Sequence, residues 1–328
     1  MKIFISIASY QDPLLETTIL SAFNNAIAPE NLHFGICDQS SKPLDISLFS
    51  FASQISYEHI DPKTSEGPCW ARHRIQNFYE NEDYYFQIDS HMQFENGWDE
   101  YLLKYMIKIQ SDQSEFHKLP IISSYPRAFD VIDFDKKIFK LLDDDKKTHT
   151  IAYREDSIFL KDSFSRQIGA ISETEITHGY LLAAGCLLAP GSFVKEVPYD
   201  SEFYFYGEEI SIMLRAFTRG FSIFHIPAVP VFHLYTDVSD IKRKLHWDEE
   251  EDKKREIKWH ERERKSIERL SQIIDGKLDG IFGLGNKRSL EDYEFLSGIN
   301  FKKRCITNKS KAVTAEFISS LSWKESPF

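Results

Sequence analysis

The sequence predicts an α/β protein with a mostly parallel central sheet flanked by helices and with a C-terminal helical extension. Between residues 3 and 89, short apolar runs alternate with segments whose apolar residues have helical spacing, a pattern typical of parallel α/β sheets. From about residue 238 the composition becomes densely charged. We therefore expect a main domain over 1–237 and an extension over 238–328. With 42% hydrophobic residues, the 328-residue chain can bury a large core.

The elements of the first part follow from periodicity. Short apolar runs, several rich in β-branched or aromatic residues and bounded by polar or turn residues, predict strands. Segments with apolar residues on one helical face, as at Leu15, Ile19 and Phe23, predict helices. The expected strands are 3–9, 32–39, 55–61 and 84–89, and the expected helices are 14–26 and 69–80.

The second part is less regular. Residues 121–175 indicate strands and loops whose order stays open. Further on we expect an apolar stretch over 177–194, an amphipathic helix over 208–221 and two short strands around the prolines of 221–235. Residues 242–269 carry 11 Lys or Arg and 9 Asp or Glu, which predicts one charged helix with both signs interleaved.

Composition excludes several classes of protein. The net charge of -11 argues against a nucleic-acid binder. No run of about 18 apolar residues exists to span a membrane, and the apolar opening stops too early for a signal peptide. The four cysteines, none in a CxxC pair, favour reduced thiols in a cytoplasmic protein over disulfides or a thiolate zinc site. They are Cys37, Cys69, Cys186 and Cys305.

Three of the four expected strands of the first part end in polar residues. They are Ser9, Asp38 with Gln39, and the triplet Asp89-Ser90-His91. Ligands of parallel α/β sheets bind outside the carboxyl ends of the strands, so a site is expected there. If the triplet continues its strand, Asp89 and His91 point to one face and Ser90 points away.

Asp89 and His91, joined by His233 at the end of another apolar run, are candidate metal ligands. Oxygen and nitrogen donors without thiolate suit Mn²⁺ or Mg²⁺, and three ligands leave positions for a diphosphate. The alternative of a structural strand histidine stays open for His233.

Two other groups have functional and structural interpretations. Arg72 and Arg74 on the 69–80 helix suit anionic ligands, or they are solvated surface arginines, more so for Arg74. Glu208 and Glu209 begin the 208–221 helix, where the helix dipole alone explains acidic residues. The chain has no GxGxxG, Walker or GxSxG motif.

The order of these motifs resembles GT-A glycosyltransferases, which have a Rossmann-like fold. It runs GPCWAR (67–72), QIDSHMQF (87–94), AAG (183–185), YGEE (206–209) and VFHLY (231–235), with Asp-Ser-His in place of the usual Asp-x-Asp. With FISIASYQDP, FGICDQ and LGNKRSLEDYEFLSGINF (284–301), most of the chain is similar to the polypeptide α-GlcNAc-transferases, glycosyltransferase family 60. Members of that family modify hydroxyproline in cytoplasmic proteins.

The resemblance implies a role for each motif residue. Asp89, His91 and His233 would hold Mn²⁺, with Mg²⁺ possible, and the metal would bridge the diphosphate of a UDP-sugar. Glu208 or Glu209 would stand beside the donor sugar and the acceptor. The residues assigned to the donor are Ser9, Asp38, Arg72, Ser90, Gly185 and Tyr235. Of these, Ser9, Asp38 and Arg72 would contact uridine.

The function expected is therefore metal-dependent, retaining transfer of a sugar from a UDP-sugar to a protein or glycan. GlcNAc is the first expectation, while galactose, glucose and GalNAc stay open. A metal-dependent hydrolase and a non-catalytic nucleotide-sugar-binding module are the alternatives. The extension is expected to pack on the main domain and to shape the acceptor side, because its apolar residues need burial. These are Tyr293, Phe295, Leu296, Ile299 and Phe301.

Overall fold

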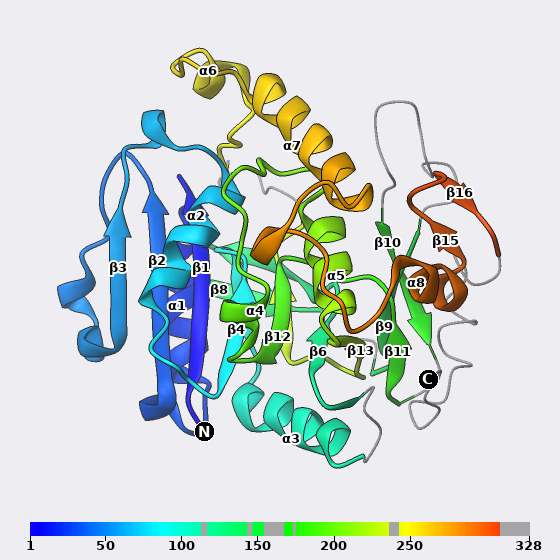
Figure 1. Cartoon of the computed structure of the whole chain (residues 1–328). Helices are drawn as coiled ribbons and strands as arrows, with labels where there is room; N and C mark the ends of the chain where they lie inside the picture. Colours follow the sequence, from blue (N-terminus) through cyan, green and yellow to red (C-terminus); the bar gives the residue numbers. More distant parts are fainter. Residues whose placement is uncertain (113–116, 143–145, 154–166, 173–174, 236–242, 309–328) are drawn as a thin grey trace.

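The fold is built around one large mixed sheet (Figure 1). A computed structural model describes residues 1–112, 117–142, 146–153, 167–172, 175–235 and 243–308. The sheet has eight strands in the order β11-β13-β6-β12-β4-β1-β2-β3. Their bounds are β1 Ile3–Tyr10, β2 Leu32–Gln39, β3 Ile55–His59, β4 Tyr84–Ile88, β6 Pro120–Ser123, β11 Thr177–Gly179, β12 Cys186–Pro190 and β13 Ser222–His225.

The first four strands form the parallel half of the sheet that the sequence predicts. β1 pairs in parallel with β2 and β4, and β2 pairs in parallel with β3. The other half is mixed, because β12 runs antiparallel to both β4 and β6, and β11 runs antiparallel to β13. The pair of β13 with β6 is parallel.

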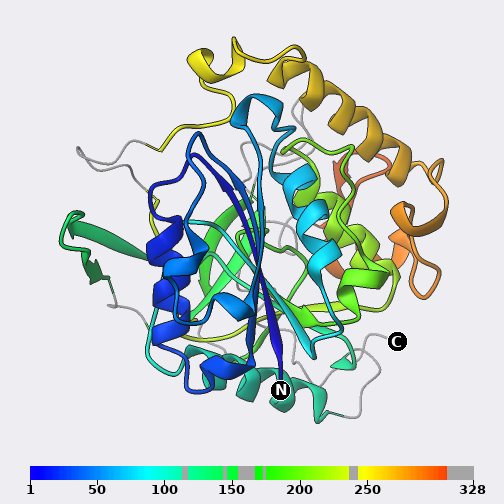
Figure 2. The ribbon, with the colours of Figure 1, turned by 90° about the vertical axis from the view of Figure 1, so that its left-hand side faces the viewer.

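Helices cover both faces of the sheet, and side-chain alternation along β1 assigns the two cores. Ile3, Ile5 and Ile7 belong to the core with α1 and α3, whereas Phe4 belongs to the core with α2, α5, α7 and α8. Figure 2 shows α1 and α2 on opposite sides of the strands. The bounds are α1 Leu15–Asn24, α2 Pro68–Ile75, α3 Trp98–Gln110, α4 Phe193–Glu196, α5 Glu208–Thr218, α7 Trp259–Ile274 and α8 Leu290–Ser297.

A smaller four-stranded sheet, in the order β5-β14-β7-β8, lies beyond the carboxyl end of β4. Its bounds are β5 Met92–Phe94, β7 Arg127–Asp133, β8 Ile138–Leu141 and β14 Val231–His233. Two two-stranded sheets complete the described strands: β9 Thr148–Tyr153 with β10 Gln167–Ser172, and β15 Ile299–Asn300 with β16 Cys305–Ile306. Residues 121–175 are thus mainly strands where the structure describes them.

The expectation of one charged helix over 242–269 is wrong. The segment contains α6, Glu249–Asp252, and the start of α7, with a break between them. In the break Arg255 turns inward and is only 5% exposed. It donates to the backbone oxygen of His246 and to the hydroxyl of Tyr10. A tertiary contact at a basic residue therefore ends the helix that charge patterning predicts.

The C-terminal part shares its core with the rest of the chain. Leu270 and Ile273 of α7, with Tyr293 and Leu296 of α8, belong to the same hydrophobic cluster as α2 and α5. Figure 1 shows α7 beside α5, which it contacts. Ile299 and Phe301 are buried as expected, but Phe295 is 70% exposed, because it lies on the side of α8 that faces away from this core.

Candidate active site

The triplet Asp89-Ser90-His91 forms the bend between β4 and β5. β4 ends at Ile88, so the expectation that the triplet continues a strand is wrong. Thr18 of α1 holds the bend, because its hydroxyl donates to the backbone oxygen of Ser90 at 2.8 Å and accepts from the backbone nitrogen of Met92 at 2.9 Å. The strand therefore stops where a helix side chain supplies the hydrogen bonds that a sheet neighbour would otherwise make.

Pairing of β14 with β5 brings His233 to the triplet. His233 is opposite Met92 in the antiparallel register, and the backbone nitrogen of Leu234 donates to the oxygen of His91 at 3.2 Å. The Nε2 atoms of His91 and His233 are 2.9 Å apart, and His233 Nε2 is 3.4 Å from Asp89 Oδ2. One donor atom from each of the three residues lies within 4.8 Å of the others. We name these three residues the Asp-His-His cluster.

The Asp-His-His cluster fits a divalent cation. Its donors are one carboxylate and two imidazole nitrogens, the set that suits Mn²⁺ and related ions. Burial alone would raise the pKa of Asp89, but the hydrogen bond from His233 and the charge of Arg72 outweigh it and hold that pKa well below its usual range. Burial lowers the pKa of His233. An ionised carboxylate and a neutral imidazole are the forms that bind metals.

A cavity of about 360 Å³ opens beside Asp89 and His233. Arg72 lies in its wall and joins two carboxylates, with 2.9 Å to Asp89 Oδ1 and 2.6 Å to Glu208 Oε1. Arg72 is only 5% exposed, whereas Arg74 is partly exposed and pairs with Glu58. The solvated interpretation thus fits Arg74 and not Arg72.

Glycines give the cluster its close packing. A Cβ on Gly185 would lie 2.3 Å from Asp89 Oδ2, so no other residue fits there without moving the carboxylate. Gly67, just before α2, has a φ of +108°, and its Cβ would lie 2.6 Å from the ring of Tyr204. The G-P-C-W-A-R spacing therefore sets where α2 begins and hence where Arg72 points.

Glu209 also lines the first cavity. Its Oε1 accepts from the backbone nitrogen of Ala184 at 2.9 Å, and its Oε2 accepts from Gln167 Nε2 at 2.5 Å. Burial raises the pKa of Glu209 to about 7, although the bond from Ala184 opposes this rise. Tyr235 lines the same cavity, beside His233, and its hydroxyl donates to the oxygen of Pro126 at 2.6 Å.

A second cavity, of about 280 Å³, lies on the other side of the triplet. Asp89 lines both cavities, His233 lines the first and His91 the second, so the Asp-His-His cluster lies between them. Phe205 is also common to both. The other residues around the second cavity include Tyr10, Asp12, Gln39, Gly67, Ser90, Arg243, Lys244, His246 and Trp247.

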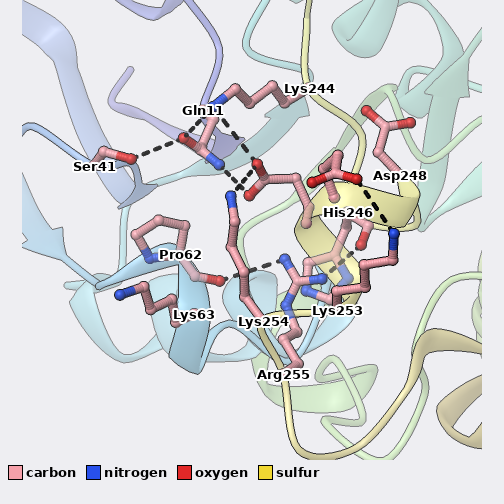
Figure 3. Close-up of polar contacts among 12 residues, drawn as sticks. Gln11, Ser41, Pro62, Lys63, Lys244, His246, Asp248, Lys253, Lys254 and Arg255 are labelled. Atoms are coloured by element: carbon pink, nitrogen blue, oxygen red, sulfur yellow. Dashed lines mark hydrogen bonds and ion pairs between the residues drawn. The ribbon is translucent and has the colours of Figure 1, made fainter.

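Residues 243–258, which we name the docking segment, close one side of the second cavity and are fixed to the end of β1 (Figure 3). Glu251 is 4% exposed and accepts from the Tyr10 hydroxyl at 2.9 Å and from Gln11 Nε2 at 2.6 Å. Gln11 also accepts from the hydroxyl of Ser41 at 2.9 Å. With the contacts of Arg255, these bonds tie the extension to the first strand.

The structure brings together most of the residues singled out in the sequence. Arg72, Gly185, Glu208, Glu209 and Tyr235 line the first cavity with Asp89 and His233, and Ser90 lines the second with His91. Ser9 is fully buried and lines neither cavity. Asp38 accepts from the Tyr57 hydroxyl at 2.7 Å and lines a separate depression.

Sequence reasoning missed Asp12 and the docking segment. Asp12 follows the first strand and Asp38 lies at the end of the second, so polar residues at strand ends were a usable signal, but Asp12 with Pro13 indicated only a strand stop. Charge patterning gave no sign that Arg255 and Glu251 are buried, because their partners lie about 240 residues away. Among the described helices, none is long and apolar enough to cross a membrane.

Comparisons with known proteins connect this geometry to one family and one fold. The family model described as "Glycosyltransferase (GlcNAc)" matches residues 2–50 and 41–303. A crystal structure of GalNAc-T7 with UDP, GalNAc and Mn²⁺ is similar at a TM-score of 0.53 and 13% identity, over 72% of this chain and 43% of that chain. The match thus spans less than half of GalNAc-T7.

Staphylococcus aureus TarS 1–349 in complex with UDP-GlcNAc is similar at a TM-score of 0.44 and 12% identity, over 85% of this chain and 68% of that chain. No curated protein sequence matches the chain.

Proposed function

The chain belongs to the glycosyltransferase (GlcNAc) family and has the GT-A fold expected from its sequence, and on this premise we propose a specific reaction. The protein transfers a sugar, GlcNAc as first expectation, from a UDP-sugar to a protein or glycan with a divalent cation and with retention of configuration. The observation that carries the proposal is the Asp-His-His cluster between two cavities. The cation we propose is Mn²⁺, with Mg²⁺ as the alternative, and the relationship to family 60 belongs to the same proposal.

The two cavities suggest how the donor lies. The nucleoside diphosphate occupies the second cavity, where Arg243 and Lys244 bring positive charge and Tyr10 and Gln39 offer polar groups. The sugar occupies the first cavity, where Glu208 and Glu209 can accept hydrogen bonds from its hydroxyl groups. The linkage between phosphate and sugar then passes Asp89, which lines both cavities.

Individual donor residues fit this placement unequally. Gly185 and Tyr235 lie at the sugar side and Ser90 at the nucleotide side. Arg72 holds Asp89 and Glu208 in place, which favours a contact on the sugar side over the expected contact with uridine. Ser9 and Asp38 line neither cavity, so nothing in the geometry supports their contact with uridine.

The chain's own residues prepare the site for the departure of UDP. When bound, a divalent cation supplies Lewis-acid stabilisation of the charge on the leaving diphosphate. Asp89 is kept ionised by Arg72 and His233. Glu208 is bonded to Arg72, and Glu209 is bonded to Ala184 and Gln167, so neither carboxylate is clearly placed as a nucleophile. We therefore propose that the acceptor attacks from the face that UDP leaves.

Release of UDP from a panel of UDP-sugars tests the proposal without the acceptor. We expect slow Mn²⁺-dependent release from one donor, abolished by chelator and reduced at least about 100-fold in Asp89→Ala and His91→Ala. Thermal stabilisation by UDP with Mn²⁺ is the binding control, because a hydrolase would lack tight uridine binding. Binding of UDP without turnover of any donor would favour a non-catalytic module. If the wild type shows no UDP binding and no UDP release from any donor, the assignment of the cluster is wrong.

A further inference from the structure

The carboxylate of Asp12 lies directly behind His91. His91 Nδ1 is 2.7 Å from Asp12 Oδ2, while its other ring nitrogen, Nε2, is the one 2.9 Å from His233. Ser90 Oγ donates to the same Asp12 oxygen at 2.8 Å, and the backbone nitrogen of Leu14 donates to Oδ1 at 2.9 Å. The Asp12 side chain is only 5% exposed. Both oxygens of a buried carboxylate are therefore used, and one of them orients the triplet.

This contact selects one tautomer of His91. An ionised carboxylate only accepts hydrogen bonds, so the proton of the neutral imidazole must be on Nδ1. Nε2 then carries a lone pair that points at Asp89 and His233. His233 differs, because its Nδ1 is buried and has no hydrogen-bond partner among the described residues. Among the described residues, His91 is therefore the histidine of the cluster whose second ring nitrogen, Nδ1, is bonded to a carboxylate.

The backbone before Asp12 is held in an uncommon conformation. Gln11 has a φ of +44°, in the left-handed region that non-glycine residues seldom adopt. Its side chain is bonded to Glu251 and to Ser41, the second of which is labelled in Figure 3. Its backbone nitrogen donates to the backbone oxygen of Gln39 at 3.1 Å. Strain of this kind persists only where the surroundings fix it. This conformation of Gln11 places the Asp12 side chain in contact with Ser90 and His91 of the triplet.

We propose that Asp12 is a positioning residue for the cation site: it holds His91 with the proton on Nδ1 and with Nε2 free to bind the cation. The inference rests on the proposed function, since it takes His91 to be a cation ligand. Ser90 acts in the same arrangement, because its hydroxyl donates to the Asp12 oxygen that also accepts the hydrogen bond from His91 Nδ1.

The first test needs no change to the site. Long-range ¹H–¹⁵N spectra of the metal-free wild type report which nitrogen of each histidine carries the proton, and His91 is assigned from the signals lost in His91→Gln. We expect the Nδ1–H form for His91. Protonation of Nε2 in a neutral His91 ring would overturn the proposal.

The second test is Mn²⁺ affinity, measured by the loss of the electron paramagnetic resonance signal of free Mn²⁺. Asp12→Asn keeps the shape of the side chain but replaces one carboxylate oxygen by an amide nitrogen, which donates instead of accepting. One acceptor oxygen is then left for donors on its two sides, so either His91 must change tautomer or the backbone nitrogen of Leu14 loses its partner. We expect affinity to fall by about 10- to 100-fold. The matched control is Asp61→Asn, because exposed Asp61 also accepts from the backbone two residues on, Lys63, at 2.9 Å.

The outcomes separate this inference from the proposed function. A wild type that does not bind Mn²⁺ would overturn the cation site itself. If the wild type binds and Asp12→Asn binds equally well, the role of Asp12 is wrong and the site stands. The effect of Asp12→Asn should also vanish in a His91→Ala background, since Asp12 acts through His91. Unfolding measured without metal shows whether Asp12→Asn is folded. If it is not folded, the tautomer of His91 in the ¹H–¹⁵N spectrum of the wild type decides the proposal.

Discussion

At the residue scale, Asp89 depends on neighbours from three distant segments. Arg72 comes from α2, His233 from β14, and Gly185 precedes β12. Arg72 and His233 keep the carboxylate ionised despite its burial, and Gly185 leaves room for it. A change at any of the three therefore acts on the same carboxylate, at Oδ1 for Arg72 and at Oδ2 for His233 and Gly185.

Gly185→Ala tests how tightly Asp89 is held. The added methyl would lie 2.3 Å from Asp89 Oδ2, so the carboxylate must rotate away from the cluster. We expect Mn²⁺ affinity and UDP release to fall about tenfold or more. Gly169→Ala is the control, since its methyl would meet only an ordinary contact at 3.6 Å from the ring of Tyr125. Equal Mn²⁺ binding by both variants would contradict the prediction.

Glu209 gives stability a pH dependence. Because burial raises its pKa from 4.5 to about 7, the folded chain holds a proton that the unfolded chain loses above pH 4.5. Stability from this group is therefore present below pH 4.5 and is lost as the pH rises to about 7.

In Glu209→Gln this loss should disappear. The buried Gln167 Oε1, which has no partner in the described structure, can accept from the new amide after a flip of the Gln167 side chain. The difference in free energy of unfolding between the variant and the wild type should shift by about 1–3 kcal/mol in favour of the variant between pH 4.5 and pH 8. Urea unfolding at the two pH values measures this shift. A difference independent of pH would show that Glu209 ionises normally.

At the element scale, two short pieces of chain assemble the site. β14 pairs with β5 and places His233 opposite Met92, and the docking segment covers the end of β1 and closes the second cavity. Neither piece is stable alone, because a three-residue strand and a four-residue helix make few bonds of their own. Their positions come from the contacts they make with β1, β5 and β7.

Arg255→Met tests the docking segment. It removes the charged donor to Tyr10 and to the oxygen of His246 from a buried position, at a cost of about 2–3 kcal/mol. We expect a lower melting temperature and weaker UDP binding, because the segment closes the proposed nucleotide cavity. Lys253→Met in the same segment is the control, since Lys253 makes only exposed ion pairs and should change neither. Loss of stability with unchanged UDP affinity would separate the segment from the nucleotide.

At the scale of the whole molecule, the C-terminal part is built into the core. Leu270, Ile273 and Tyr293 are each at most 1% exposed and belong to the cluster that contains α2 and α5. The tyrosine hydroxyl donates to the backbone oxygen of Tyr180 at 2.8 Å. We propose that residues 243–308 support the nucleotide side through the docking segment and, through α8, the main sheet.

A chain that ends at residue 236 should therefore be unstable. Truncation would expose the apolar side chains of the main domain that now pack against α7 and α8. We expect a fall in melting temperature, loss of UDP binding and faster amide exchange in α5, which contacts both helices. Retention of full stability and of UDP release would show that the extension is dispensable.

The sequence by itself determined the strands of the parallel half, the polar residues at their ends and the motif order that resembles GT-A enzymes. Those features are local, because periodicity and strand-end polarity depend on neighbours in the chain. It also placed Arg72, Glu208 and Glu209 among the candidates. The same reasoning could not place the interruption of the charged helix or the exposure of Phe295.

Only the tertiary structure decided what surrounds each candidate. His233 reaches His91 through a strand pairing across 142 residues, and Asp12 reaches it across 79. Glu251 and Arg255 are buried although their segment is patterned like a solvated helix. The physical reason is that pKa shifts, tautomers and close glycine contacts arise from atoms brought together by folding. A chain pattern of period 2 or 3.6 carries no information about those partners.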